Sequence, residues 1–500
     1  VMELQIMPRS GLAAAAVLAL ACSTSLLAQS KPGESDHYAV DTLAAPESVV
    51  LEAGGLLPFE DRLLVCTRRG EVWTVLRPWS EAPEFILSFE GLQEPLGLLE
   101  GTGENAGWIY VSQRGELSRI RDDDGDHRFD RLETVNDDWE LSGSYHEYTF
   151  GPVRDAHGDL WITLNRPFGP EPFGSKDWRG WAVRIDADNQ AHFETAGLRS
   201  PCGLTASPDG EIFYTDNQGE WTPTNKLAVL QRGGFHGHPW GIESAKRPES
   251  NVSHPGGIPD RTPLPEFVEK VRSFTLPAVW FPYDKMGRSA SGFAWDTTGG
   301  KFGPFEGQIF VGDQHHASVM RVDLEKVDGL WQGACFPFRE GLQCGVIRVA
   351  FAPDGSLIVG QTNRGWASRG SKPYGVERLR FTGEAPFEIR SMKALADGFR
   401  LEFTQPVDAA TAIDPSSYSM TRYTYRHHSD YGSPEILAEP CPIESGSVAA
   451  DGLSGELSVG NRRELFVHEL LAEGVRSAQG RPLLHPEAYY TLNRIPKGGE

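Results

Sequence analysis

Short apolar runs joined by tight turns recur along the chain. In GLTASPDGEIFYTD (203–216), apolar and polar residues alternate on both sides of an Asp-Gly pair. The stretches 151–164 and 348–361 have the same order of apolar run, glycine-containing turn and apolar run. Alternation of this kind around an Asp-Gly turn predicts an antiparallel β-hairpin.

Six stretches share this pattern, which makes the hairpin an internal repeat. They are residues 56–75, 95–120, 150–165, 203–217, 291–314 and 346–365. One hairpin cannot bury both of its faces, so the units must pack on one another. The pattern therefore predicts an all-β chain with a six-bladed β-propeller over residues 45–382.

The pattern changes near residue 383. Residues 386–496 contain short alternating strands without the hairpin repeat. A region of this length with short strands predicts a C-terminal immunoglobulin-like β-sandwich. Its expected role is packing or docking, and we expect the chemistry to lie in the propeller.

The N-terminal residues have the pattern of a secretory signal peptide. Arg9 precedes an apolar run over residues 12–21, and small residues follow up to Ala28. We expect residues 1–29 to be cleaved, which would leave a periplasmic or secreted protein without a transmembrane segment. Cys22 follows Ala-Leu-Ala, so lipidation at Cys22 is the alternative to simple cleavage near Ala28.

Composition adds limits to this picture. The formal net charge of -22 argues against nucleic acid as a partner, because phosphate binding needs a basic surface. Five cysteines follow Cys22, and an odd, sparse set is not a disulfide framework. Cys335 and Cys344 are close enough in sequence to form a disulfide, and the alternative is that all five are buried free thiols.

Residues 122–133, DDDGDHRFDRLE, have the ligand spacing of an EF-hand loop. Carboxylates stand at positions one, three, five, nine and twelve, and position seven would offer its backbone carbonyl. These residues are Asp122, Asp124, Asp126, Asp130, Glu133 and, at position seven, Arg128. His127 occupies position six, where glycine is usual. We expect calcium here, bound in an isolated loop between blades.

Further polar residues stand just outside the predicted blade strands. In a propeller these positions converge on the central channel, and burying polar groups there without a ligand is costly. The residues are Gln93, His146, Arg199, Asp216, Gln314, Arg348 and Arg364. This pattern indicates a binding or catalytic site at the centre of the ring.

Residues 45–380 resemble the soluble pyrroloquinoline-quinone (PQQ) dependent glucose/sorbosone dehydrogenases, which are six-bladed propellers. The resemblance rests on GLQEPLGLLEGTGENAGWIYVS, GSYHEYTFGPVRDAHGDLWITL, GLRSPCGLTASPDGEIFYTDNQG, NKLAVLQRGGFHGHPWG and RVAFAPDGSLIVGQTNRG. It is strongest to a subgroup of membrane-bound dehydrogenases in planctomycete-like bacteria. Tyr145 and Ser200 depart from it, since the family has Asp and Asn at these positions.

The resemblance implies a role for each candidate residue. It makes His146 the general base, with Gln93 beside it in the catalytic site. It assigns cofactor binding to Arg199, Arg348, Asp216, Gln314 and Arg364. The implied reaction is oxidation of a sugar or a related polyol or aldehyde with PQQ, followed by electron transfer to a separate acceptor such as a periplasmic cytochrome.

Two other functions stay open at this point. One is a calcium-dependent hydrolase of the lactonase type, which would need a central metal bound by carboxylates from several blades. The other is a propeller that binds carbohydrate or protein without catalysis. The two departures at Tyr145 and Ser200 leave room for both.

Overall fold

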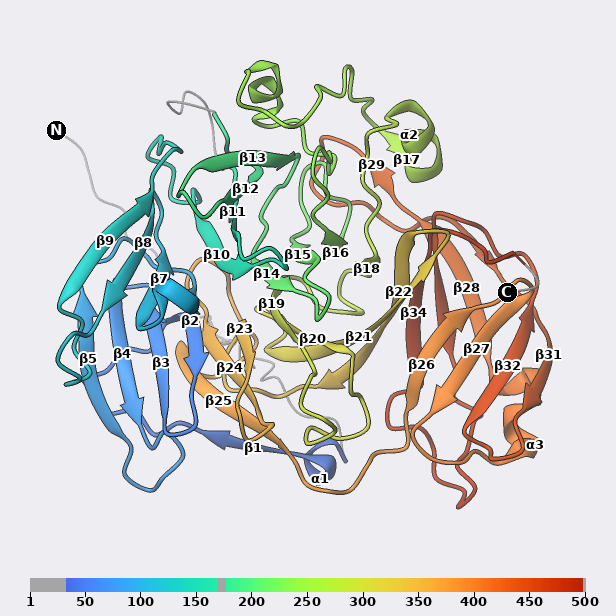
Figure 1. The fold of residues 1–500 in the computed structure, drawn as a ribbon. Coiled ribbons are helices and arrows are strands. Elements are labelled where there is room, and N and C mark those ends of the chain that lie inside the picture. The colour runs from blue at the N-terminus through green and yellow to red at the C-terminus, as the bar shows by residue number, and fades with distance from the viewer. Residues whose placement is uncertain (1–32, 169–176, 498–500) are drawn as a thin grey trace, which may run out of the picture.

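The computed structural model describes residues 33–168 and 177–497. Strands dominate this part of the chain. Five four-stranded antiparallel sheets and a sixth four-stranded unit, which continues into a larger sheet at the C-terminal end, are arranged around a centre (Figure 1). The all-β prediction is confirmed. The predicted signal peptide and Cys22 lie outside the described residues. None of the described helices is long and apolar enough to cross a membrane.

The first three blades are continuous in sequence. Blade one contains β2 (Ala53–Pro58), β3 (Arg62–Thr67), β4 (Glu71–Leu76) and β5 (Glu84–Glu90). Blade two contains β6 (Leu98–Glu100), β7 (Trp108–Ser112), β8 (Leu117–Arg121) and β9 (Arg131–Asn136). Blade three contains β10 (Thr149–Arg154), β11 (Leu160–Leu164), β12 (Trp181–Ile185) and β13 (Ala191–Ala196).

The other three blades include insertions and a strand from the N-terminus. Blade four contains β14 (Gly203–Ala206), β15 (Ile212–Asp216), β16 (Asn225–Val229) and β18 (Val279–Phe281). Blade five begins with β19 (Ala290–Trp295), β20 (Ile309–Asp313), β21 (Ser318–Val327) and β22 (Leu330–Arg339). Blade six contains β23 (Val346–Phe351), β24 (Leu357–Thr362), β25 (Tyr374–Phe381) and β1 (Tyr38–Thr42).

The helices are short and lie outside the blades. They are α1 (Glu34–His37), η1 (Gly103–Asn105), η2 (Ile242–Lys246), α2 (Leu264–Lys270), α3 (Ala409–Ala412) and η3 (Pro415–Ser417). Two of them, η2 and α2, belong to the long insertion between β16 and β18, together with the short strand β17 (Thr262–Pro263).

The six inner strands form a closed ring. Each of β2, β6, β10, β14, β19 and β23 contacts the next, and β23 contacts β2. The six hairpin stretches of the sequence fall in six different sheets. Packing at the centre is tight, since a Cβ on Gly97 would lie 1.8 Å from the carbonyl oxygen of Gly151. Glycine at position 97 is therefore required by the close approach of two inner segments.

The N-terminal strand completes the last blade. β1 pairs antiparallel with β25, with Tyr38 opposite Phe381. The ring thus begins at residue 38, before the predicted start at residue 45. The hairpin pattern did not indicate β1, because β1 has no hairpin partner next to it in sequence. The buried ring of Tyr38 packs on Phe302, Phe338 and Phe381, with centroids 4.6–5.6 Å apart.

The C-terminal region has two sheets. One contains β26 (Ile389–Ala394), β27 (Gly398–Phe403), β32 (Ser454–Val459) and β31 (Ile443–Val448). The other contains β34 (Glu487–Leu492), β33 (Phe466–Leu471), β28 (Ser419–Thr424) and β30 (Ile436–Pro440), and it continues blade five through β22. The immunoglobulin-like topology stays a prediction. We call residues 386–496 the C-terminal module.

Strand β22 serves two hydrophobic cores at once. Cys335 faces the core of the propeller, whereas Ala334 and Phe336 face the core of the C-terminal module. This division follows from the alternation of side chains along a strand. The five described cysteines are free thiols, so Cys335 and Cys344 do not form a disulfide. Burial raises the pKa of the Cys344 thiol to about 12.

Tyr38→Ala tests whether β1 holds the ring closed. Removing a buried aromatic side chain that packs on three phenylalanines is expected to lower the free energy of unfolding by about 3–5 kcal/mol. Tyr38→Phe keeps the packing and loses only the hydrogen bond from the hydroxyl to the Phe302 carbonyl, so about 1 kcal/mol is expected. Urea denaturation measures both changes. Equal stability of the two variants would contradict this account of ring closure.

Candidate functional site

A pocket of about 260 Å³ lies over the centre of the ring. Loops of all six blades line it, because the segments before each inner strand and after each second strand meet at this end of the channel. One lining residue, Tyr431, comes from the C-terminal module, which was expected to have only a packing or docking role. The volume is slightly below the usual range for small-molecule pockets, which begins at about 300 Å³.

Positive charge dominates the wall of the pocket. Arg68, Arg199, Arg288 and Arg364 line it, and none of the described lining residues is Asp or Glu. The whole chain has a net charge of -22, so this local excess of arginine is opposite to the average of the protein. The pocket is therefore suited to an anionic ligand.

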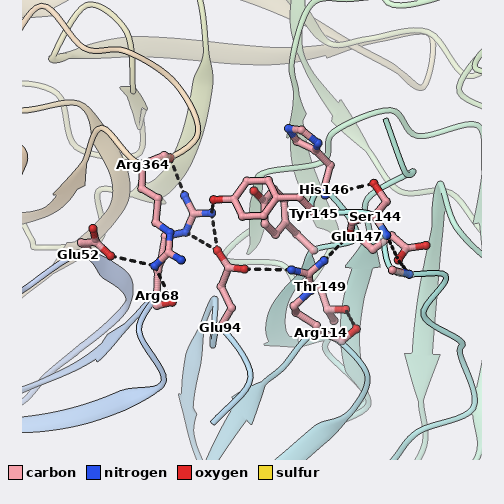
Figure 2. Close-up of polar contacts among 12 residues, drawn as sticks. Glu52, Arg68, Glu94, Arg114, Ser144, Tyr145, His146, Glu147, Thr149 and Arg364 are labelled. Atoms are coloured by element: carbon pink, nitrogen blue, oxygen red, sulfur yellow. Dashed lines mark hydrogen bonds and ion pairs between the residues drawn. The ribbon is translucent and has the colours of Figure 1, made fainter. Parts of the chain in front are cut away.

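Carboxylates behind the wall hold the arginines in place. Glu94 accepts hydrogen bonds from Nε and Nη2 of Arg68, at 3.0 and 2.5 Å, and from Arg114 at 3.3 Å (Figure 2). Arg364 pairs with Glu52 at 3.0 Å. Arg68 also donates to the backbone carbonyl of Arg364 at 2.7 Å, which links blades one and six. The arginines are thus held before any ligand arrives.

In blades four and five, buried aspartates hold the backbone of the loops that carry the arginines. The carboxylate of Asp216, at the end of β15, accepts from the backbone N–H groups of Arg199 and Ser200 at 3.1 and 2.6 Å. The carboxylate of Asp313, at the end of β20, accepts from those of Arg288 and Ser289 at 2.8 and 2.6 Å.

Asp216 therefore differs from its predicted role as a cofactor ligand. It is fully buried, it does not line the pocket, and both of its oxygens bind the backbone that carries Arg199. Its remaining neighbour is the buried Lys226, whose Nζ lies 3.7 Å away.

The predicted base, His146, lies on the pocket wall. The loop before it is held by the buried carboxylate of Glu147, which accepts the backbone N–H groups of Ser142, Gly143 and Ser144 (Figure 2). The imidazole stands 4.6 Å from the Phe168 ring and makes no hydrogen bond within the described chain.

Burial and nearby positive charge keep His146 neutral. Burial is the largest cause that lowers its pKa, and Arg199, Arg166, Arg114 and Arg68 add to the effect. A neutral imidazole at pH 7 has a free ring nitrogen that can accept a proton. The position of His146 therefore suits a general base.

Aromatic rings form another part of the wall. Tyr148, Phe150, Phe168, Trp366 and Tyr431 line the pocket. Two of them, Trp366 and Tyr431, are large apolar residues that remain exposed, and so does the neighbouring Tyr145. Flat aromatic walls together with arginine favour a planar anionic ligand.

Two further predicted cofactor residues, Gln314 and Arg364, lie on this pocket. The amide of Gln314 donates to the backbone carbonyls of Thr362 and Arg364 at 3.1 and 3.2 Å, which connects blade five to the loop after β24. With His146 and Arg199, four of the seven channel residues expected from sequence are brought together here.

Arg348 lies in the layer below the pocket. Its guanidinium donates to the carbonyl oxygens of Gly54, Leu96, Cys202 and Ile347 at 2.6–3.2 Å. Leu96 and Cys202 line both this pocket and a second cavity of about 170 Å³ on the far side, and Arg348 lines only the second. Its donors are occupied by backbone carbonyls, which leaves it unsuited to bind a cofactor in the first pocket.

Gln93 is exposed and does not line the pocket. Its backbone N–H donates to the side chain of Gln113 at 2.6 Å. The next residue, Glu94, has a φ of 47° and directs its carboxylate to Arg68 and Arg114 instead. The residue of this loop that supports the site is therefore Glu94.

The predicted calcium loop is only partly assembled. The carboxylates of Asp122, Asp124 and Asp130 lie within 4.8 Å of one another. Glu133 instead pairs with Arg119 at 2.6 Å. The other predicted ligands, Asp126 and Arg128, are joined to each other by a backbone N–H to carboxylate bond of 2.8 Å. His127, at the position usual for glycine, has a φ of 67°.

Sequence reasoning missed Arg68, Arg288, Trp366 and Tyr431. A signal for Arg68 exists, since each blade has a polar residue directly after its second strand. These residues are Arg68, Gln113, Asn165, Asn217, Gln314 and Asn363. A second signal is the pair of similar segments RSPCG (199–203) and RSASG (288–292), which points to Arg288.

The low pKa of His146 can be measured without any ligand. Diethyl pyrocarbonate acylates the unprotonated imidazole, so its rate at His146, followed by peptide mass spectrometry, reports the neutral fraction. The inflection is expected below 6.5, the ordinary value, and Arg199→Gln is expected to move it back toward 6.5. Exposed His157 provides an internal reference for reagent activity. A wild-type inflection at or above 6.5 would contradict the proposed environment.

No family model matches this chain, and no curated protein matches it. Solved structures do resemble it. A glucose dehydrogenase-type oxidoreductase from Thermus thermophilus has 18% identity and a TM-score of 0.48 over 68% of this chain and 99% of its own. The PQQ-bound aldose sugar dehydrogenase of Streptomyces coelicolor has 14% identity and a TM-score of 0.48, covering 69% and 98%.

The PQQ domain of pyranose dehydrogenase from Coprinopsis cinerea, in its holo form, has 10% identity and a TM-score of 0.48, covering 71% of this chain and 97% of its own. The similarity to these sugar dehydrogenases is one of fold. It does not assign a ligand or a reaction to this chain.

Proposed function

We propose that this protein is a periplasmic or secreted oxidoreductase that oxidises a sugar, or a related polyol or aldehyde, with PQQ as cofactor. The observation that carries the proposal is the composition of the central pocket. Four arginines, no lining carboxylate, aromatic walls and a neutral histidine meet there. Electrons would then pass to a separate acceptor such as a periplasmic cytochrome.

The donor set of the pocket fits this cofactor. PQQ is a flat fused-ring quinone with three carboxylate groups, and guanidinium groups bind carboxylates through paired N–H donors. Arg199, Arg288 and Arg364 would hold these groups, and the aromatic walls would contact the ring faces. Arg68 would add positive charge, because its nitrogens already donate to Glu94 and to the Arg364 carbonyl. The carboxylates that hold the arginines stand behind them and do not line the pocket.

When bound, PQQ supplies a two-electron acceptor for hydride from the carbon that carries the substrate hydroxyl. A free ring nitrogen of His146 accepts the hydroxyl proton as the carbon–oxygen double bond forms. The surrounding arginines stabilise the negative charge that develops in this step. Two of these arginines, Arg199 and Arg68, also add to burial in keeping His146 unprotonated in the resting protein.

The lactonase alternative has less support in this pocket. A central calcium would need carboxylate ligands from several blades, and none lines the described wall. The only described group of three metal-ligating side chains is the surface loop at Asp122, Asp124 and Asp130. Ligand binding without catalysis is the remaining alternative, and the next experiment separates it from oxidation.

Reconstitution of the purified protein with PQQ tests the proposal. Calorimetric titration is expected to show saturable binding, and dye reduction is expected with at least one aldose or ketose. His146→Ala should keep PQQ binding and lower kcat by about 10²–10⁴-fold, the usual contribution of a general base.

His157→Ala is the matched control, because His157 is exposed on a turn away from the pocket, and it should keep full activity. Absence of PQQ binding by the wild-type protein would end the proposal. Binding without turnover of any sugar would favour a binding propeller.

Calcium binding to loop 122–133 is a separate proposal. If the three convergent carboxylates recruit the others, calcium should raise the midpoint of thermal unfolding in a concentration-dependent way. Asp124→Asn should remove this effect, whereas Asp137→Asn, in an acidic stretch just after the loop, should keep it. A midpoint that does not respond to millimolar calcium would show that the loop is an acidic hairpin.

A further inference from the structure

We infer that the C-terminal module is a working part of the central pocket, and that its Tyr431 positions the guanidinium of Arg199. Tyr431 lies in the loop 428–433, between β29 (Arg426–His427) and β30. It lines the pocket although it belongs to a region outside the predicted propeller. The inference rests on the proposed function only for the identity of the ligand.

The loop 428–433 is fixed to blade four by backbone hydrogen bonds. The N–H of Trp221 donates to the carbonyl of His428 at 2.7 Å, and the N–H of Gly432 donates to the carbonyl of Gly219 at 3.1 Å. The N–H of Ser433 donates to the carbonyl of Pro223 at 2.8 Å. The loop therefore pairs with the connection between β15 and β16, where Glu220 and Tyr431 form an isolated antiparallel bridge.

A second contact anchors the base of this loop. β29 pairs with β17, with His427 opposite Thr262. His427 is buried, and its Nε2 lies 3.0 Å from the carbonyl oxygen of Gly237. Burial lowers the pKa of His427 to about 3, so the ring is neutral and Nε2–H is the donor. The module is thus attached to the insertion of blade four at two places.

The loop 428–433 packs closely against blade four at two glycines, Gly432 and Gly219. Gly432 has a φ of 65°, and a Cβ there would lie 2.7 Å from the side chain of Gln218, another lining residue. Gly219, which pairs with Gly432, lies against the guanidinium itself, since its Cβ would be 1.9 Å from Cζ of Arg199. Two glycines thus allow the loop to reach the arginine.

Three groups hold the Arg199 guanidinium. Its Cζ lies 4.6 Å from the Phe168 ring centre and 5.4 Å from that of Tyr431. Glu220 binds its Nε and Nη2, both at 3.0 Å. Within the described chain Nη1 makes no hydrogen bond, and it is left for a ligand carboxylate. Rings near the guanidinium restrict its rotation, so less entropy is lost when an anion binds.

Tyr431 is 55% exposed, and the exposed Trp366 lines the same pocket, so large exposed aromatic side chains gather there. Its exposed part faces solvent at the pocket mouth, and its other part covers an arginine that is only 6% exposed. We therefore treat it as a positioning residue for Arg199, acting from a different module than the arginine itself.

Two measurements on the full chain test this inference. The first is calorimetric titration with PQQ, in which Tyr431→Ala is expected to weaken binding about five- to tenfold. The second needs no ligand: phenylglyoxal modifies guanidinium groups, and peptide mass spectrometry follows its rate at Arg199. Loss of the ring should speed this modification several-fold. Tyr431→Phe should behave as the wild type, because the ring makes the contact.

Two further variants sharpen the test. Gly432→Ala keeps Tyr431 but displaces its loop, so it should resemble Tyr431→Ala. Ile413→Ala removes another exposed apolar side chain of the same module, away from the pocket, and should change neither readout. Thermal unfolding of all variants should stay cooperative, which excludes loss of the module as the cause.

The outcomes separate the inference from the proposed function. If the wild type does not bind PQQ but Tyr431→Ala speeds modification of Arg199, the proposed cofactor is wrong and the positioning role stands. Unchanged modification of Arg199 in Tyr431→Ala overturns the positioning role. Faster modification of Arg199 with unchanged PQQ affinity shows that the contact between Tyr431 and Arg199 does not contribute to ligand binding, which also overturns the inference.

Discussion

The guanidinium of Arg348 connects several blades at the centre of the ring by hydrogen bonds. Six inner strands converge there, and their carbonyl groups next to the channel need partners that the sheets do not supply. Arg348 binds carbonyls from the segments that open blades one, two and four, as well as the carbonyl of its neighbour Ile347. It thereby forms a fixed floor, and the loops that carry the functional groups rise from that floor.

Above this floor, charges are arranged in two layers. Arginines face the pocket, and Glu52, Glu94 and Glu220 stand behind them. Removing a charge from water is expensive unless a partner compensates it, so the outer carboxylates make the inner arginines stable. Burial, the largest cause, and the nearby arginines lower the pKa of His146, since both disfavour imidazolium.

Much of the blade architecture follows from local pattern. A glycine-containing turn marks the hairpin stretch of each blade, with Asp-Gly in blades four and six, because turn chemistry and alternation act over a few residues. β1 was missed, since its partner β25 lies more than 330 residues away. The continuation of blade five into the C-terminal module was missed for the same reason, since β22 meets β34 across about 150 residues.

The site was harder to predict than the fold. Residue type and position beside a strand placed His146, Arg199, Gln314 and Arg364 correctly on the channel, but they do not reveal which way a side chain turns. In the loop after β5, Glu94, which has a positive φ angle, supports the site in place of the predicted Gln93. The carboxylate of Asp216 binds the backbone of the loop before β14, and the guanidinium of Arg348 binds carbonyls below the pocket. Tyr431 gave no local signal, because only tertiary folding brings its loop to the pocket.

The shared sheet of blade five also bears on self-association. An outer blade strand with unpaired backbone groups is a template for edge-to-edge aggregation. β22 avoids this by pairing with β34, so the exposed edge moves to β30. That strand is a poor template, since Leu437 bends it with a φ of 54°, Glu439 adds charge and Pro440 ends it. The C-terminal module thus covers residues 333–335 of the outer strand of blade five against edge-to-edge pairing.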